Sequence, residues 1–318
     1  MTDQDSAEED GGAGAFRPIP GGSFLMGSDD HYPEEAPVGT VEVADFWIAE
    51  AQVTVAEFRE FVDETGYLTV AERSPDPAMY PGADPAMLVP GSLMFRMPAG
   101  PVPLEDPSAW WEWKPGASWR HPWGPGSDLD GKDDHPVTQV CWEDASEYAR
   151  WRGVRLPTEA EWERAARGGL EGAEFPWGDD LSPGGEEAMN RWIGEFPWDW
   201  SPGPREGERP DTVDVRTFQP NEYGLYGVTG NVWEITSTWF TTGGPLDSEC
   251  CGGQGPERKL EASREPGSGI PRKVMKGGSF LCAENYCSRY RPAARIPQTV
   301  ESGTCHAGFR CAADSPPG

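Results

Sequence analysis

The abundance of proline and glycine alongside tryptophan constrains this chain strongly, because few regular architectures tolerate it. Its 318 residues include 33 Pro, 40 Gly and 15 Trp. Proline lacks a backbone N–H and glycine weakens helix and strand interiors, so neither a long helical bundle nor a simple strand sandwich would use them this heavily. Indole rings can instead fill the core of an irregular, loop-rich fold. One domain is expected, since tryptophans run from Trp47 to Trp239 without a polar gap of linker length.

The charge balance excludes two classes of partner. A formal net charge of −28 would repel nucleic-acid phosphates and anionic membrane surfaces. A cationic peptide would be attracted, although a diffuse acidic surface most often serves solubility alone. No window approaches the roughly 18 consecutive apolar residues of a transmembrane helix, so no membrane span is expected.

The N-terminus and the cysteines together predict a cytoplasmic protein. Residues 1–15 are acidic and glycine-rich without an apolar run, which fits a disordered tail and not a secretory signal or a mitochondrial presequence. The seven cysteines are an odd number. In a reducing compartment we expect free thiols or metal ligation in place of structural disulfides.

Periodicity and capping signals predict three helices. The first spans residues 53–66, the second about residues 143–152, and the third begins within residues 156–162 and ends at 168–169. In the first and third, a Thr-x-x-Glu capping box marks the start, formed by Thr54 with Glu57 and by Thr158 with Glu161.

Elsewhere the pattern predicts short strands and loops. Residues 16–26 are expected to form a strand pair with glycine turns. Residues 74–137 hold many prolines and no sustained periodicity, so we expect a long ordered loop. Its tryptophans either form a binding surface or pack the loop onto the domain. Residues 241–271, rich in Gly, Pro and Ser, are expected to form a mobile loop.

Two cysteines near the C-terminus, Cys282 and Cys287, are the strongest candidates for chemistry. They follow a Gly-Gly-Ser segment and precede a cluster of arginines that would favour thiolate over thiol. No second cysteine knuckle appears, which argues against structural zinc. Thiolates suit copper(I). Spacing alone leaves three interpretations open: packed inert thiols, a redox pair, or a metal site.

The remaining candidate groups give weaker signals. The four histidines are scattered, and no dinucleotide-binding or P-loop fingerprint is present. Cys305 precedes His306, a pair that would act as nucleophile and base only if the ring reached a thiol. Asn190 and Glu234 could offer oxygens to calcium, although polar turn residues are the ordinary interpretation. The other thiols are expected to be exposed (Cys250, Cys251) or to be buried small hydrophobes (Cys141, Cys311).

Several segments, taken in order, resemble one family, the formylglycine-generating enzymes, also called sulfatase-modifying factors. With the cysteine pair in this context, the chain is most similar to the catalytic bacterial, actinobacterial type. The resemblance spans residues 16–314 as one domain. The matching motifs are Gly21-Gly-Ser-Phe-Leu-Met-Gly27, Gly66-Tyr-Leu-Thr69, Asp134-His-Pro-Val137, Arg155-Leu-Pro-Thr-Glu-Ala-Glu-Trp-Glu163, Phe175-Pro-Trp-Gly178, Tyr223-Gly-Leu-Tyr226, Gly230-Asn-Val-Trp-Glu234, Lys276-Gly-Gly-Ser279 and Gly308-Phe-Arg310.

This resemblance implies a fold and an activity. The fold would be α+β, an irregular single domain low in regular secondary structure and related to C-type lectin folds. The activity would be oxidation by O2 of one cysteine in a sulfatase Cys-x-Pro-x-Arg motif to Cα-formylglycine, with release of sulfide. The partner would be an unfolded or nascent type I sulfatase polypeptide, and the protein would act as a monomer.

The resemblance also implies roles for individual residues. Cys282 and Cys287 would bind copper(I), with the substrate cysteine as a third thiolate, and Ser279 and Trp233 would line the oxygen pocket. His306 stands where many members have Asn. The residues expected to bind substrate are Trp119, Arg120, Tyr286 and His306.

Calcium is a further expectation from the family. One family site usually begins with Asn or Asp, at the position of Gly227 in this chain. The residues expected to hold calcium are Asn190, Arg191, Gly230, Val232 and Glu234.

Two rival functions belong to other branches of the superfamily. One is a non-catalytic, lectin-like paralogue that binds peptide or saccharide through its aromatic loop, and retention of both cysteines argues against it. The other is an iron-dependent sulfoxide synthase, which would need an additional helical domain and a histidine-rich ligand set that this sequence lacks.

Overall fold

Short capped helices are set among loops in the computed structural model, which describes residues 14–77, 82, 84, 88–201, 209–246 and 256–317. Helix α1 confirms the first capping box: Thr54 Oγ1 accepts from the Glu57 amide at 3.2 Å, and the Glu57 carboxylate accepts from the Thr54 amide at 2.8 Å. Gly66 ends the helix with φ of 68°. The helices are α1 (Val55–Thr65), α2 (Trp142–Trp151), α3 (Glu159–Ala166) and α5 (Pro256–Ala262).

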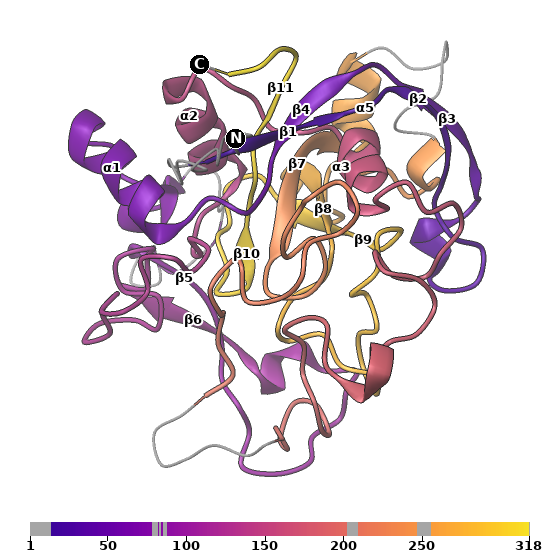
Figure 1. Cartoon of the computed structure of the whole chain (residues 1–318). Coiled ribbons are helices and arrows are strands. Elements are labelled where there is room, and N and C mark those ends of the chain that lie inside the picture. The colour runs from indigo at the N-terminus through magenta and orange to yellow at the C-terminus, as the bar shows by residue number, and fades with distance from the viewer. Residues whose placement is uncertain are drawn as a thin grey trace, which may run out of the picture.

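Helices α2 and α3 also lie where the sequence predicts them. The Thr158–Glu161 capping box is present at the start of α3, and Gly168, with φ of 60°, follows its end. One face of α3 is buried against β7 (Trp233–Trp239) and β8 (Arg272–Lys276) of the central sheet (Figure 1). The helix thereby places Glu159 and Glu163 in the interior of the protein.

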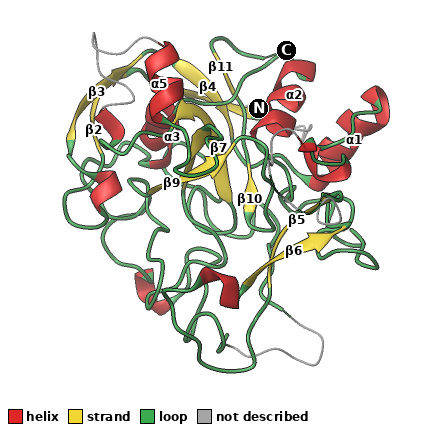
Figure 2. Cartoon of the chain, turned by 180° about the vertical axis from the view of Figure 1, so that it is seen from behind, coloured by secondary structure: helices red, strands yellow, loops and turns green. Residues whose placement is uncertain are grey.

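Among the described residues, strands form four small sheets, and loops make up much of the rest (Figure 2). The sheet orders are β1-β4-β11, β10-β7-β8-β9, β2-β3 and β5-β6. The strands are β1 (Phe16–Ile19), β2 (Gly22–Met26), β3 (Gly39–Val43), β4 (Phe46–Ala49), β5 (Gly91–Phe95), β6 (Trp111–Pro115), β7 (Trp233–Trp239), β8 (Arg272–Lys276), β9 (Arg295–Thr299), β10 (Ala307–Gly308) and β11 (Ala312–Ala313).

The predicted strand pair in residues 16–26 is wrong in its pairing. Strands β1 and β2 do not pair with each other: β1 pairs with β4 and β2 with β3, in one continuous antiparallel register. Residues 16–26 are therefore one arm of a long ribbon whose other arm is residues 39–49. Gly21 lies between β1 and β2, and a Cβ there would be 2.6 Å from the Asp45 amide nitrogen. The chain continues along its partner instead of turning back on itself.

The predicted loop 74–137 contains a hairpin that the sequence pattern does not show. Strands β5 and β6 pair from Gly91 with Pro115 to Phe95 with Trp111. The strands are joined by a long connection without a tight-turn signature, and β5 is buried on both faces at most positions, so alternation is absent.

Three predicted segments fall partly outside the described residues, one of them the loop 74–137, of which residues 78–81, 83 and 85–87 are not described. Residues 1–13 of the expected acidic tail and residues 247–255 of the expected mobile loop are not described. The described part of that loop contains α5. Its mobility and the domain limits stay predictions.

The central sheet positions the cysteines. Strand β8 leads from Lys276 into residues 277–294, here named the cysteine loop, and β9 returns from Arg295. Trp233 begins β7, which pairs with β8.

Among the described residues, no helix is long and apolar enough to cross a membrane.

Candidate active site

The two thiols of the cysteine loop lie side by side. Cys282 Sγ and Cys287 Sγ are 3.2 Å apart, and Cys282 is buried while Cys287 is partly exposed. A turn brings them together, since the Cys287 amide donates to the Ala283 carbonyl at 2.9 Å. The Ser279 amide donates to Cys282 Sγ at 3.4 Å. The structure thus joins two side chains that the sequence singles out.

The loop can fold this way because its first turn is made of glycine. Gly278 has φ of 77°, and a Cβ there would lie 2.8 Å from Tyr290 Cα. A side chain would therefore be strained by its backbone conformation and would clash with the returning arm of the loop. The Gly-Gly-Ser segment lets the two arms of the cysteine loop approach each other closely.

A pocket of about 200 Å³ opens over the thiols. Of the predicted site residues, it brings together Cys282, Cys287, Ser279, Trp233, Tyr286 and His306. The other lining residues were not predicted from the sequence, although Trp110 and Trp111 belong to the tryptophan-rich loop 74–137. These other residues are Trp110, Trp111, Phe196, Leu281, Arg289 and Ile296.

Arg289 supplies positive charge beside Cys287. Its Nη1 atom is 3.9 Å from Cys287 Sγ. The guanidinium also stacks over the Tyr32 ring, with Cζ 3.5 Å from the ring centroid, and its Nη2 pairs with Glu34. The hydrogen bond from the Cys282 thiol, aided by Arg289, lowers the pKa of Cys287 to about 7. Burial, with the neighbouring Cys287 sulfur adding to it, raises the pKa of Cys282. The pair therefore favours one thiolate at Cys287 and one thiol at Cys282 near neutral pH.

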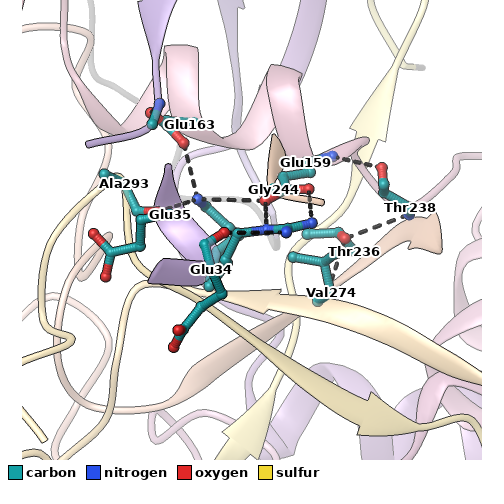
Figure 3. Close-up of polar contacts among 12 residues, drawn as sticks. Glu34, Glu35, Glu159, Glu163, Thr236, Thr238, Gly244, Val274 and Ala293 are labelled. Carbon is teal, nitrogen blue, oxygen red and sulfur yellow. Dashed lines mark hydrogen bonds and ion pairs between the residues drawn. The ribbon is translucent and has the colours of Figure 1, made fainter. Parts of the chain in front are cut away.

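Buried ion pairs close the neck of the cysteine loop (Figure 3). Lys276 Nζ, before the loop, donates to Ala293 O at 3.1 Å, near the loop's end, and to Glu163 at 2.9 Å. Arg295 forms two hydrogen bonds with Glu159 at 2.7 and 3.0 Å. Because all four charged side chains are buried, each depends on its partner, and α3 fixes both arms of the loop.

His306 lines the pocket as a neutral ring. Its Nδ1 is 2.7 Å from Thr304 Oγ1, and its ring lies 4.9 Å from that of Trp111. Burial lowers the pKa of His306 to about 3. Tyr286, about a third exposed, stacks on Phe196 at 4.8 Å and forms part of the rim. Cys305 Sγ accepts from the Phe95 amide at 3.3 Å, and the His306 ring has Thr304 as its hydrogen-bond partner.

Trp119 and Arg120 do not line this pocket. The Trp119 ring is 1% exposed and packs edge-on against Phe58 at 5.3 Å. Arg120 stacks on Trp119 at 4.4 Å and reaches Glu72. A fully buried ring has no surface to offer a peptide, so the expected substrate contact at Trp119 is not supported. A substrate role for Arg120 stays a prediction.

The residues expected to hold calcium do not fit that ion at Glu234. Both carboxylate oxygens of Glu234 accept from Arg310, at 2.6 and 2.7 Å, and a bidentate arginine leaves no net negative charge for a divalent cation. Gly230 donates its amide to Gly277 O, and Val232 lies in the core. The residues around Glu234 therefore do not fit the calcium expected there.

At the second expected calcium position, side chains also find protein partners. The Asn190 amide nitrogen donates to Asp211 O at 3.0 Å. The buried Arg191 guanidinium pairs with Glu187 and Glu284. Calcium at Asn190 stays a prediction.

Copper(I) does fit the two thiols. Soft sulfur donors suit a soft monovalent cation, and the lowered pKa of Cys287 makes one thiolate available near neutral pH. Within the described ranges, no group of three or more His, Cys, Asp or Glu side chains forms a metal site. The protein itself thus offers two ligands beneath an accessible pocket.

Comparison with known proteins places this architecture. The family model for the sulfatase-modifying factor enzyme 1-like domain matches residues 6–315. The chain is 49% identical over 301 residues to a formylglycine-generating enzyme of Mycobacterium tuberculosis, covering 93% of this chain and 96% of that one. It is 43% identical to the formylglycine-generating enzyme of Thermomonospora curvata, covering 93% and 92% of the two chains.

The fold comparison agrees. The structure of PvdO from Pseudomonas aeruginosa covers 94% of each chain with a TM-score of 0.58 and 21% identity, and it supports the α+β fold with little regular secondary structure. With the family model spanning nearly the whole sequence and the paired thiols lying in one pocket, the chain belongs to the formylglycine-generating enzyme family.

Proposed function

We propose that this protein is an oxidase that converts a cysteine of a sulfatase polypeptide to Cα-formylglycine, with copper(I) at Cys282 and Cys287 and with O2 as the oxidant. The observation that carries the proposal is the pair of sulfur atoms 3.2 Å apart at the base of an open pocket. A binding module would not require two adjacent thiols with opposite pKa shifts. The relatives named above support the conversion itself.

The chain's own residues divide the work of binding and positioning. Cys282 and Cys287 would hold the metal, and copper supplies the redox chemistry with O2 when bound. Trp233 and Ser279, both buried, form walls that exclude water around the thiols. A substrate cysteine entering the pocket would place its thiol above them, and Tyr286 and His306 would contact the flanking peptide.

In the overall conversion, O2 would accept two electrons and two protons from the substrate CH2–SH group, which leaves a thioaldehyde. Water would then replace the sulfur with oxygen and release sulfide. Arg289 is placed to stabilise negative charge on sulfur at Cys287. Because the site would use the substrate thiol as a ligand, turnover would wait for the correct peptide. Action on unfolded or nascent sulfatase chains, as a monomer in the cytoplasm, belongs to the same proposal.

A peptide assay tests this function. Copper-loaded protein is incubated under air with Leu-Cys-Thr-Pro-Ser-Arg, and mass spectrometry follows conversion of CH2SH to CHO. We expect aldehyde with the wild type and a loss of at least about a hundredfold in rate with Cys282→Ser or Cys287→Ser, because removal of a metal ligand abolishes the site.

Matched controls separate this loss from misfolding. Cys141→Ser and Cys311→Ser alter buried thiols outside the pocket and should keep the aldehyde product in whatever fraction folds. A wild type that forms no aldehyde, or cysteine-pair variants that match it, would contradict the proposal.

A further inference from the structure

The Glu234 carboxylate has no acceptor position left for a metal ion. Oε1 accepts from Gln52 Nε2 at 2.9 Å and from Arg310 Nη2 at 2.7 Å. Oε2 accepts from Trp162 Nε1 at 2.7 Å and from Arg310 Nε at 2.6 Å. A carboxylate offers about four acceptor positions, and protein donors fill all of them. Glu234 is 1% exposed, so a cation could bind only by displacing these donors.

Arg310 is equally fixed. Besides Glu234, its guanidinium donates to the carbonyls of Ala49, Glu50 and Tyr226, at 3.2, 3.3 and 2.9 Å. The side chain is fully buried. Moving it aside for a cation would leave several donors without acceptors, and leaving it in place would set two positive charges side by side.

The Gln52 side chain lies between the Gly227 carbonyl oxygen and the Glu234 carboxylate. Its Nε2 lies 2.6 Å from Gly227 O and 2.9 Å from Glu234 Oε1. Both neighbours are acceptors, so the atom between them is the amide nitrogen. Gln52 is 1% exposed, and its Oε1 has no hydrogen-bond partner within the part of the chain that the structure describes. The Gln52 Oε1 atom therefore stays unpaired, because turning it toward Gly227 O and Glu234 Oε1 would bring three acceptors together. Only a donor or a cation can lie between those two oxygens.

We propose that the Gln52 amide and the Arg310 guanidinium take the place of a divalent cation at Glu234. The start of β7, and with it Trp233 in the pocket wall, is thus positioned without metal. This contradicts the calcium that the family resemblance implies at Gly230, Val232 and Glu234. The inference does not depend on the catalytic proposal, because it concerns only how this frame is held.

The test exchanges one atom of Gln52. Gln52→Glu puts a carboxylate against Gly227 O and Glu234, an arrangement that only a cation or a proton can relieve. Gln52→Met removes the bridge without adding charge and is the matched control. The melting temperature of each protein is measured in EGTA and in excess calcium, and calcium content after dialysis is measured by atomic emission.

We expect the wild type to melt at the same temperature in both conditions. Gln52→Met should melt lower than the wild type and equally in both. Gln52→Glu should melt lowest in EGTA and recover in calcium, with one additional ion bound per chain.

Two results would overturn the inference. One is a calcium response of the wild type that Gln52→Met loses, which would make Gln52 Oε1 a ligand. The other is a Gln52→Glu that melts at the wild-type temperature in EGTA, which would show that the Gln52 amide is not needed between Gly227 O and the Glu234 carboxylate. If Gln52→Glu does not fold, the effect of calcium on the melting temperature is compared between the wild type and Gln52→Met. A calcium effect that both proteins share places the ion away from Gln52, as proposed.

Discussion

At the scale of single residues, the site depends on charge placed beside sulfur. Cys282 and Cys287 are chemically identical in sequence, yet their surroundings divide them. Cys287 accepts the hydrogen bond and lies near Arg289, whereas Cys282 is enclosed by the loop. The difference in pKa between the two thiols follows from these contacts, and it makes Cys287 the group that ionises first.

Removal of the Arg289 charge should raise the pKa of Cys287. In metal-free protein, the pH midpoint for alkylation of Cys287 by iodoacetamide should rise by roughly one pH unit in Arg289→Met, because an opposite charge within about 4 Å favours the thiolate. Peptide mass spectrometry of the alkylated protein gives the midpoint for each thiol. Arg120→Met, whose guanidinium stacks on Trp119 outside the pocket, is the control and should leave the midpoint in place. An unchanged midpoint in Arg289→Met would show that the Cys282 hydrogen bond acts alone.

At the scale of elements, α3 connects a local sequence signal to the site. Its capping box lies in the segment Thr158–Glu161, and the turn that this box starts carries Glu159 and Glu163. Those carboxylates hold Arg295 and Lys276 at the two ends of the cysteine loop (Figure 3). A helix cap therefore influences catalytic geometry through two buried ion pairs.

Loss of the α3 cap should affect activity more than loss of the α1 cap. Thr158→Ala and Thr54→Ala remove equivalent capping side chains and should each lower the free energy of unfolding by about 1 kcal/mol, measured by urea denaturation. Only Thr158→Ala should also reduce kcat/KM for the peptide, since α3, unlike α1, carries the carboxylates that bind Lys276 and Arg295 at the neck of the loop. Equal kcat/KM in the two variants would contradict this coupling.

At the scale of the whole molecule, acidic residues outnumber basic ones, but buried carboxylates are paired with buried arginines. The chain carries a net charge of −28, whereas the buried carboxylates of Glu35, Glu159 and Glu234 each face an arginine. The excess negative charge opposes folding through self-repulsion, and it attracts cationic ligands. Salt screens both effects.

Salt should therefore stabilise the fold and slow substrate capture. We expect the melting temperature to rise from low to moderate sodium chloride, and kcat/KM for the arginine-containing peptide to fall over the same range. The same peptide with citrulline in place of arginine is the control, and its kcat/KM should depend less on salt. A melting temperature that falls with salt would show that surface ion pairs outweigh the repulsion.

Local signals in the sequence determined helices α1, α2 and α3, whereas α5 lies in a segment predicted to be a loop. The capping boxes at Thr54 and Thr158 and the glycines after α1 and α3 act within one turn of chain, so they can be read without knowledge of the fold. The cysteine pair and the family motifs identified the site residues Cys282, Cys287, Ser279 and Trp233, and the structure places all four in one pocket.

Long-range contacts decided the rest. The pairing of β1 with β4 and the β5–β6 hairpin join segments with no local turn signal. Burial of Trp119 against Phe58 and saturation of Glu234 by Gln52 and Arg310 depend on residues far apart in sequence. A side chain's chemistry is given by its identity, but whether a ring meets solvent, or a carboxylate a metal, depends on which neighbours the tertiary structure brings within hydrogen-bonding distance.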